Sequence, residues 1–221
     1  MMPEHSALAL QGRKILVTRP IRQVSGLVDL IEQQGGEAIV FPVIEITTID
    51  VKQWGEWNPQ QTNWLVFVSR NAVEHFLQDL PLPLPANVKL VAAGEGTAQA
   101  LRQNGLTVDL QPELSNGSEG LLQLPQWQQM AHQHVVIVRG EGGRELMADT
   151  LRARGANISY LEVYRRQLPT VSSELQQQAC SADWLTATSA NGVTNLLSLL
   201  SASCPQILQK PLLMVQSFSD L

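Results

Sequence analysis

The chain contains an internal repeat with a spacing of 120 residues, and this repeat restricts the possible folds more than any other feature. The ten residues from Trp64 (WLVFVSRNAV) match those from Trp184 (WLTATSANGV), and the six from Ile15 (ILVTRP) match those from Val135 (VVIVRG) at the same spacing. A third pair, residues 36–41 and 155–160, is one residue out of step. Matches at a common spacing predict two copies of one structural half. Chance similarity between any two strand-Ser-helix segments is the alternative.

Short apolar runs rich in β-branched residues alternate with amphipathic stretches along the whole chain. This alternation is typical of α/β proteins built on parallel sheets. We expect strands at residues 15–18, 38–41, 65–69, 90–93, 135–139 and 184–188. We expect helices at residues 21–34, 98–104 and 144–154, each followed by a glycine (Gly35, Gly105 and Gly155) that can cap the helix in the αL conformation. Ligands of such sheets gather at the carboxyl ends of the strands.

The composition indicates a globular, acidic protein. Hydrophobic residues make up 44% of the chain and charged residues 16%, which excludes a disordered protein. The net charge of −5 argues against a nucleic-acid partner, because phosphate backbones select basic surfaces. Without an apolar run of about 20 residues or a basic N-terminal region, the chain is expected to be soluble and cytoplasmic and to make no contact with membrane. Cys180 and Cys204 are too far apart in sequence to indicate a disulfide framework or a zinc knuckle, so reduced, inert thiols are expected.

Seven blocks of sequence form an ordered series. They are residues 15–20, 35–46 (GGEAIVFPVIEI), 66–73 (VFVSRNAV), 91–100 (VAAGEGTAQA), 135–145 (VVIVRGEGGRE), 161–166 (LEVYRR) and 186–193. In this order and spacing the blocks resemble the uroporphyrinogen-III synthase family, whose members close the linear tetrapyrrole hydroxymethylbilane. The resemblance extends over about residues 13–200.

The resemblance implies an α/β fold of two flavodoxin-like parallel-sheet lobes joined by a two-stranded β connection, with the substrate in the cleft between the lobes. The connecting strands are expected at residues 42–47 and 161–167. The first lobe is expected to be discontinuous, formed by residues 1–42 and 167–221, and the second to comprise residues 43–166. The family pattern continues beyond its second Ser-helix unit with further strands and helices that residues 212–221 do not match. The first lobe is therefore expected to lack its last units.

The implied substrate carries an acetate and a propionate on each ring, so its site must supply many hydrogen-bond donors. Backbone N–H groups at helix starts favour carboxylates without adding positive charge. The candidate substrate-binding residues are Thr18, Arg19, Ser69, Arg70, Gly94, Thr97, Arg139, Gly140, Gly142, Arg144 and Ser189. The alternative is that the hydroxyl residues are only helix N-caps and that the arginines are ordinary solvated surface residues.

The reaction implied by the resemblance begins with loss of the substrate's terminal hydroxyl and inverts the last ring before closure. Tyr164 matches the family's Val-Tyr motif, and a phenol can donate a proton to a departing hydroxyl, so Tyr164 is the candidate catalytic residue. A packing tyrosine at a domain junction is the alternative. The resemblance implies no cofactor and no metal. We expect a monomer whose only partner is hydroxymethylbilane.

Three alternatives to this interpretation concern a dinucleotide site, a metal site and an inactive homologue. A dinucleotide site at residues 140–145 is disfavoured because the Gly-x-Gly-x-x-Gly pattern fails at Glu145. A metal site at His132 and His134 lacks a third ligand nearby. The remaining rival is a C-terminally truncated, inactive homologue that binds tetrapyrrole or another polycarboxylate without turning it over.

Overall fold

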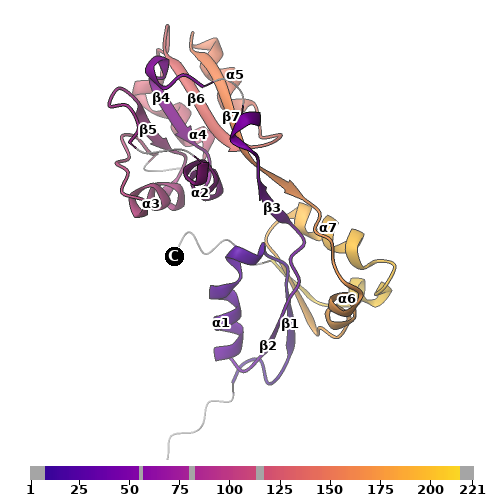
Figure 1. The fold of residues 1–221 in the computed structure, drawn as a ribbon. Helices are drawn as coiled ribbons and strands as arrows, with labels where there is room; N and C mark the ends of the chain where they lie inside the picture. The colour runs from indigo at the N-terminus through magenta and orange to yellow at the C-terminus, as the bar shows by residue number, and fades with distance from the viewer. Residues whose placement is uncertain (1–7, 55–56, 80–82, 113–116, 215–221) are drawn as a thin grey trace, which may run out of the picture. The chain divides into compact units, whose positions relative to one another are not determined.

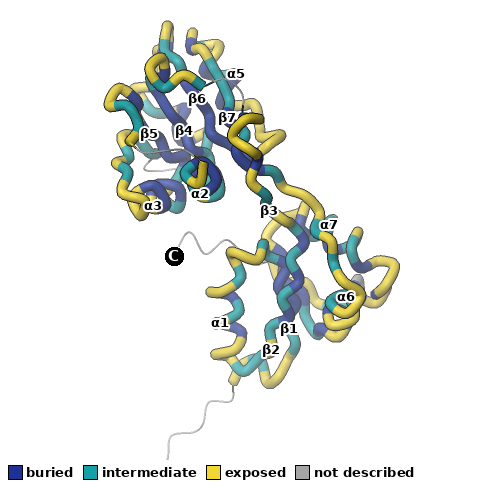
Figure 2. Tube along the Cα trace, viewed as in Figure 1, coloured by how far each residue is buried: buried dark blue, intermediate teal, exposed yellow. Residues whose placement is uncertain are grey.

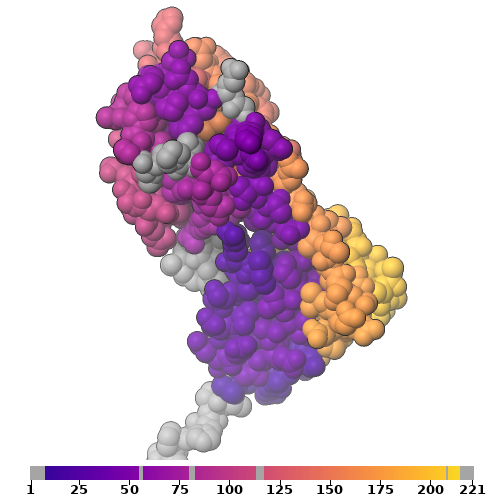
Figure 3. Space-filling model, viewed as in Figure 1, coloured from indigo at the N-terminus to yellow at the C-terminus, as the bar shows by residue number. Residues whose placement is uncertain are grey.

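The computed structural model describes residues 8–54, 57–79, 83–112 and 117–214 of the chain. These residues divide into two compact units. Unit 1 comprises the described residues up to Ile46 and those from Gln167 onward, and unit 2 comprises the described residues from Thr47 to Arg166. Figure 3 shows this discontinuity, because unit 1 combines early residues in indigo with late residues in orange and yellow.

Unit 1 is built on a four-stranded sheet with the strand order β2-β1-β8-β9 (Figure 1). All neighbouring strands in it are parallel. The elements in chain order are β1 (Lys14–Val17), α1 (Ser25–Gln33), β2 (Glu37–Val40), α6 (Ser173–Cys180), β8 (Trp184–Ala187), α7 (Ala190–Leu200) and β9 (Leu212–Met214). Two 3-10 turns, Ile21–Gln23 and Pro205–Gln209, belong to the same unit.

Helices pack on both faces of the unit 1 sheet. Successive side chains of a strand point to opposite faces, and β1 follows this rule. Ile15 and Val17 pack with Leu27 and Ile31 of α1. Leu16 belongs instead to a cluster that includes residues of α6 and α7. A strand that is buried on both faces is mostly apolar, which explains the hydrophobic run at residues 15–17 of β1.

Unit 2 is built on a five-stranded sheet with the order β3-β7-β6-β4-β5. The division between the units falls within β3, after Ile46, and before Gln167, the last residue of β7. The pairs β4–β5, β4–β6 and β6–β7 are parallel. The elements in chain order are β3 (Glu45–Thr48), β4 (Trp64–Phe67), α2 (Arg70–Asp79), β5 (Lys89–Ala92), α3 (Glu95–Gln103), α4 (Ser118–Gln123), β6 (His134–Gly140), α5 (Leu146–Ala153) and β7 (Asn157–Gln167). Short 3-10 turns lie at Val51–Gln53, Pro59–Gln61 and Pro125–Trp127.

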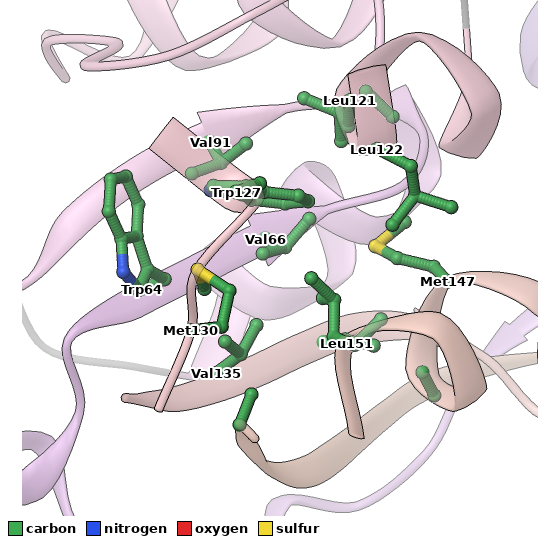
Figure 4. Packing of buried hydrophobic residues seen from close by; sticks show 14 residues of the cluster. Trp64, Val66, Val91, Leu121, Leu122, Trp127, Met130, Val135, Met147 and Leu151 are labelled. Atoms are coloured by element: carbon green, nitrogen blue, oxygen red, sulfur yellow. The ribbon is translucent and has the colours of Figure 1, made fainter. Parts of the chain in front are cut away.

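A hydrophobic cluster of unit 2 lies between one face of its sheet and helices α4 and α5 (Figure 4). Trp64 and Val66 of β4 contribute to this face, and Trp127 fills the cluster beside Met147 and Leu151. On the opposite face, the rings of Phe67 and Phe76 meet edge to face with centroids 5.1 Å apart. Figure 2 shows the result, with the central strands buried and the outer helix faces exposed.

Replacing Leu151 by alanine is expected to lower the free energy of unfolding by about 3 kcal/mol, because the side chain is fully buried and its loss leaves a cavity. Leu146 lies on the same helix but is 46% exposed, so Leu146→Ala is the matched control and should cost well under 1 kcal/mol. Urea denaturation of both variants measures the difference. Equal losses would contradict the assignment of Leu151 to the core.

The structure confirms an α/β protein with parallel sheets, and the two sheets share one strand order. Three pairs of strands begin 120 residues apart: β1 and β6, β2 and β7, and β4 and β8. When each strand is replaced by its counterpart, the order β2-β1-β8 in unit 1 corresponds to the order β7-β6-β4 in unit 2. This agreement is what the sequence repeat predicts. Gly105 and Gly155, which follow α3 and α5, have φ angles of 76° and 90°, as αL caps require.

The prediction of one continuous helix over residues 21–34 is wrong at its start. Ile21–Gln23 forms a 3-10 turn, and α1 begins only at Ser25. Ile21 is 64% exposed, so burial provides no reason for the helix to extend across it. The predicted early ending of the first lobe concerns residues 212–221, of which 215–221 lie outside the described residues.

The two cysteines are free thiols, although the fold brings them into one cluster. The thiol of Cys180 points at the carbonyl oxygen of Ser203, with a sulfur-oxygen distance of 3.8 Å. The pKa of the Cys204 thiol is raised to about 11, mainly because the thiol is buried and to a smaller extent because Cys180 lies next to it. At neutral pH Cys204 is therefore protonated and a poor nucleophile, because the thiolate is the reactive form.

Candidate functional site

Several candidate residues of unit 2 lie at one edge of its sheet, where three parallel strands end. β4 is flanked by β5 and β6, with Phe67 opposite both Ala92 and Val138. Ser69 follows β4, Gly94 follows β5, and Gly140 is the last residue of β6. Because the three strands are parallel and in register, their carboxyl ends share this edge.

Tyr164 of β7 reaches into this edge and is almost completely buried, with 1% of its surface exposed. Its hydroxyl oxygen lies 3.3 Å from the hydroxyl oxygen of Ser69. Gly140 pairs with Tyr164 immediately after an irregularity in the β6–β7 register. A Cβ atom at position 140 would lie 2.5 Å from Cε2 of the Tyr164 ring, so only glycine leaves room for the phenol.

Two further residues that were not candidates contact Tyr164. Arg166 donates a hydrogen bond from Nη2 to the phenol oxygen over 3.0 Å, and its guanidinium carbon lies 5.3 Å from the ring centroid. The ring of His75, a buried residue of α2, stacks on the Tyr164 ring with centroids 5.5 Å apart. His75 Nδ1 in turn lies 2.7 Å from Oγ1 of Thr48. The phenol is thus held on several sides.

Ser69 combines two contacts at the start of α2. Its side-chain oxygen accepts a hydrogen bond from the backbone N–H of Ala72 over 3.1 Å, which is the contact of a helix N-cap. The same oxygen faces the Tyr164 hydroxyl. Ser69 is partly exposed, whereas Tyr164 is not. Ser69 therefore connects the buried phenol to the solvent-accessible side of the edge.

Arg139 forms ion pairs within unit 2. Its guanidinium lies 2.7 Å from a carboxylate oxygen of Glu145 and 3.0 Å from one of Glu162, and it donates to the carbonyl oxygen of Gly143. The guanidinium also lies 3.8 Å from the Tyr160 ring centroid. Burial favours a lower pKa for Arg139, but the hydrogen bonds and charges of the two glutamates outweigh it and raise the pKa. These contacts tie the turn after β6 to β7.

Glu145 has a pKa below its ordinary value of 4.5, because it accepts one hydrogen bond from the Tyr160 hydroxyl and one from Arg139. A lowered folded-state pKa contributes stability that is present above the unfolded-state pKa and is lost as the pH falls through the folded-state value.

Replacing Glu145 by glutamine is therefore expected to destabilise the protein most near neutral pH. The difference in unfolding free energy between the unsubstituted chain and E145Q should shrink as the pH is lowered from about 7 to about 3. Urea denaturation across this range measures it. A difference that stays constant with pH would show that the carboxylate charge contributes nothing at this position.

The remaining candidates of unit 2 lie around the same edge and differ in burial and in the side chains they contact. Thr97 is buried in α3, whose N-cap is Gly94. Arg70 is exposed and contacts the side-chain oxygen of Gln99 at 3.5 Å. Arg144 has a 77% exposed side chain that lies 3.5 Å from Glu119. Gly142 is exposed in the turn after β6.

Three candidates belong to unit 1, where β1 and β8 are parallel neighbours. Thr18 follows β1 and is buried, and its hydroxyl donates to the backbone oxygen of Thr186 over 2.6 Å. Ser189 follows β8, is exposed, and accepts a hydrogen bond from the backbone N–H of Gly192 as the N-cap of α7. Burial lowers the pKa of Arg19, which is partly buried beside Thr18 in the chain. The edge of unit 1 therefore repeats the hydroxyl N-cap arrangement of unit 2.

The described residues contain no group of three or more histidine, cysteine or acidic side chains that could hold a metal ion. His134 instead contacts the Ser159 hydroxyl at 2.9 Å. Over the same described ranges, no helix has both the length and the apolar character needed to cross a membrane.

Comparison with known proteins gives one family. A family model described as uroporphyrinogen-III synthase HemD matches residues 25–215. The uroporphyrinogen-III synthase of Escherichia coli (strain K12) is 32% identical over 201 residues, which cover 84% of this chain and 79% of that protein. The enzyme of the same name from Proteus mirabilis is 33% identical over 159 residues, covering 69% of this chain and 79% of that protein.

Two solved structures resemble the fold. The crystal structure of uroporphyrinogen-III synthetase from Helicobacter pylori aligns with a TM-score of 0.60 at 15% identity, covering 91% of this chain and 92% of that one. A mutant uroporphyrinogen III synthase from Thermus thermophilus aligns with a TM-score of 0.58 at 20% identity, covering 85% and 77%. Because the sequence identities are only 15% and 20%, these two structures show a similar fold and nothing further.

Proposed function

Because the chain belongs to the uroporphyrinogen-III synthase family, we propose that it converts hydroxymethylbilane to uroporphyrinogen III with inversion of the last pyrrole ring. The observation that carries this proposal is the family match, which extends over residues 25–215. The reaction is a cyclising loss of water. It is redox-neutral, so the proposal requires no redox cofactor.

We propose that the substrate carboxylates bind at the carboxyl edges of the sheets. At the edge of unit 2, α2 and α3 begin directly after Ser69 and Gly94. The first backbone N–H groups of a helix have no partner within the helix and carry partial positive charge, so they favour an anion. This arrangement reconciles a net charge of −5 with a polyanionic substrate. In unit 1, Ser189 and the start of α7 offer donors of the same kind.

The chemical step requires a proton donor for the departing hydroxyl and a fixed geometry for the cationic azafulvene that remains. We assign the proton to Tyr164, whose phenol lies beside Ser69 at the carboxyl edge of unit 2. Fixed orientation supplies much of the catalytic effect. Without it, the bilane closes on its own and the last ring is not inverted. The enclosure of Tyr164 by Gly140 and His75 supports such a role.

Arg139 receives a different role in this proposal. Its guanidinium is engaged by Glu145 and Glu162, so we assign it to holding the turn after β6 rather than to binding a substrate carboxylate. Arg144 and Arg70 are exposed and stay candidates for that contact.

We also propose that units 1 and 2 are the two flavodoxin-like lobes expected from the sequence, the first being discontinuous. Support comes from the strand order β2-β1-β8-β9 in unit 1. Numbered along the chain within that unit, this order is 2-1-3-4, which is the start of the flavodoxin-like order 2-1-3-4-5. Unit 2 has the equivalent order β7-β6-β4-β5. In unit 2 the strands that correspond to β1 and β2 come late in the chain, as β6 and β7, whereas in unit 1 they come first.

The experiment that tests the function incubates the chain with freshly prepared hydroxymethylbilane and separates the uroporphyrinogen isomers by chromatography. A buffer control gives the type I isomer formed by spontaneous closure. The proposal predicts the type III isomer in the presence of the chain. Only type I product would reject the catalytic function and favour an inactive homologue.

A further inference from the structure

We propose that Tyr164 acts on the substrate through Ser69, and that Arg166 is a positioning residue that supports the phenol during proton transfer. This inference rests on the proposed function and goes beyond it by naming the group that touches the substrate. We call the three residues Arg166, Tyr164 and Ser69 the hydroxyl relay.

Burial is the first argument. Tyr164 is only 1% exposed, so its phenol cannot contact a bound substrate directly in this conformation. Its ring has little freedom, because Gly140 approaches it closely and the His75 ring stacks on it. Ser69, whose hydroxyl oxygen lies 3.3 Å from the phenol oxygen, is partly exposed. A proton from the phenol can leave the buried edge through this hydroxyl.

The hydrogen-bond directions form the second argument. A guanidinium can only donate, so Arg166 donates to the phenol oxygen. The phenol keeps its own proton for an acceptor, and the Ser69 oxygen is within reach. Ser69 already accepts from the backbone N–H of Ala72, which fixes its oxygen and leaves its own proton free to point toward a ligand. We therefore assign the order of donation as Arg166 to Tyr164 to Ser69 to substrate, although either hydroxyl can donate across the contact of Tyr164 and Ser69.

The proton balance of the step is complete. Ser69 gives its proton to the departing hydroxyl, the bond between that oxygen and the substrate carbon breaks, and water leaves. Ser69 takes the proton of Tyr164, and the resulting phenolate is stabilised by the charged hydrogen bond from Arg166. When the ring closes, the carbon that forms the last bond loses its proton, which returns along the same hydroxyls.

The sequence offers matched substitutions for each member. Asparagine is as good an N-cap as serine but cannot pass on a proton, so Ser69→Asn removes the relay and keeps the cap. Ser69→Thr keeps both. At position 166, lysine keeps a charged donor, whereas methionine removes it. Arg165 is the adjacent arginine and lies 3.7 Å from Glu141, so Arg165→Met is the control for loss of one positive charge.

The test is a double-mutant cycle on kcat for type III product, using Arg166→Met, Tyr164→Phe and the double variant. We expect Arg166→Met to lower kcat about 10- to 100-fold with little change in KM, Arg166→Lys to recover part of it, and Arg165→Met to leave it unchanged. Because Arg166 acts through the phenol, the double variant should be no slower than Tyr164→Phe alone. Ser69→Asn should be at least as slow as Tyr164→Phe, and Ser69→Thr, which keeps a hydroxyl, should be faster than Ser69→Asn.

The outcomes separate the inference from the function on which it rests. Type III product from the unsubstituted chain, together with losses that multiply in the double variant, would overturn the relay and leave the function intact. Full activity of Ser69→Asn would also overturn it. Absence of type III product from the unsubstituted chain would overturn both. Circular dichroism and the urea midpoint of each variant verify that the fold is retained.

Discussion

Replacing Tyr164 by phenylalanine is expected to lower kcat for type III product by about 100-fold, the lower range of what a proton donor contributes. The ring that packs against Gly140 and His75 is retained, so the fold should persist. Only the hydroxyl is lost, together with its contacts to Ser69 and Arg166. Kinetics under saturating bilane, with separation of the isomers, measures the effect.

The chain provides its own control for this substitution. It has two tyrosines, and the hydroxyl of Tyr160 contacts Glu145 and Arg152 instead of Ser69. Tyr160→Phe should therefore retain the kcat of the unsubstituted chain. If Tyr164→Phe also turned over at the full rate, Tyr164 would be a packing residue, the alternative that the sequence left open.

Replacing Gly140 by alanine is expected to lower both stability and activity. The new Cβ would lie 2.5 Å from Cε2 and 2.6 Å from Cζ of Tyr164, closer than such atoms approach, so the ring must move. Overpacking of this kind costs about 1 to 3 kcal/mol in the free energy of unfolding. Movement of the ring also displaces the hydroxyl from Ser69. Turnover should therefore fall by more than the loss of folded protein alone would cause.

Gly26 is the matched control, because it is exposed in α1 and a Cβ there meets nothing within 4 Å. Gly26→Ala should raise the unfolding free energy by about 0.4 to 1 kcal/mol, because alanine has fewer conformations than glycine in the unfolded chain. Urea denaturation and isomer analysis of both variants test the pair. A stable and fully active Gly140→Ala variant would mean that the position of the Tyr164 ring does not matter for the reaction.

The regular part of the fold could be predicted from the sequence because it depends on local patterns. Continuous apolar runs such as that of β1 identify strands buried on both faces, and the repeat predicts that the order of β2, β1 and β8 recurs in unit 2. Helix ends at Gly105 and Gly155 follow from the backbone conformation that glycine tolerates. The start of α1 could not be placed, because exposure of Ile21 depends on tertiary packing.

The candidate site was predictable as a set of strand ends but not as a set of contacts. Ser69, Gly140 and Tyr164 come together because parallel strands end at one edge. The contact of Arg166 with Tyr164 follows from their spacing of two residues on β7, which places both on one face of the strand, so the sequence does contain a signal for Arg166. The partners of Arg139 depend on a turn and on β7, so sequence alone could not separate a ligand contact from an internal ion pair.

The most direct test of the account is the isomer composition of the product when the chain is in excess over hydroxymethylbilane. Under these conditions each bilane meets the protein before it closes spontaneously. The account predicts that the type III share rises with the concentration of the chain and approaches the whole product. A product that stays type I at every concentration would contradict it.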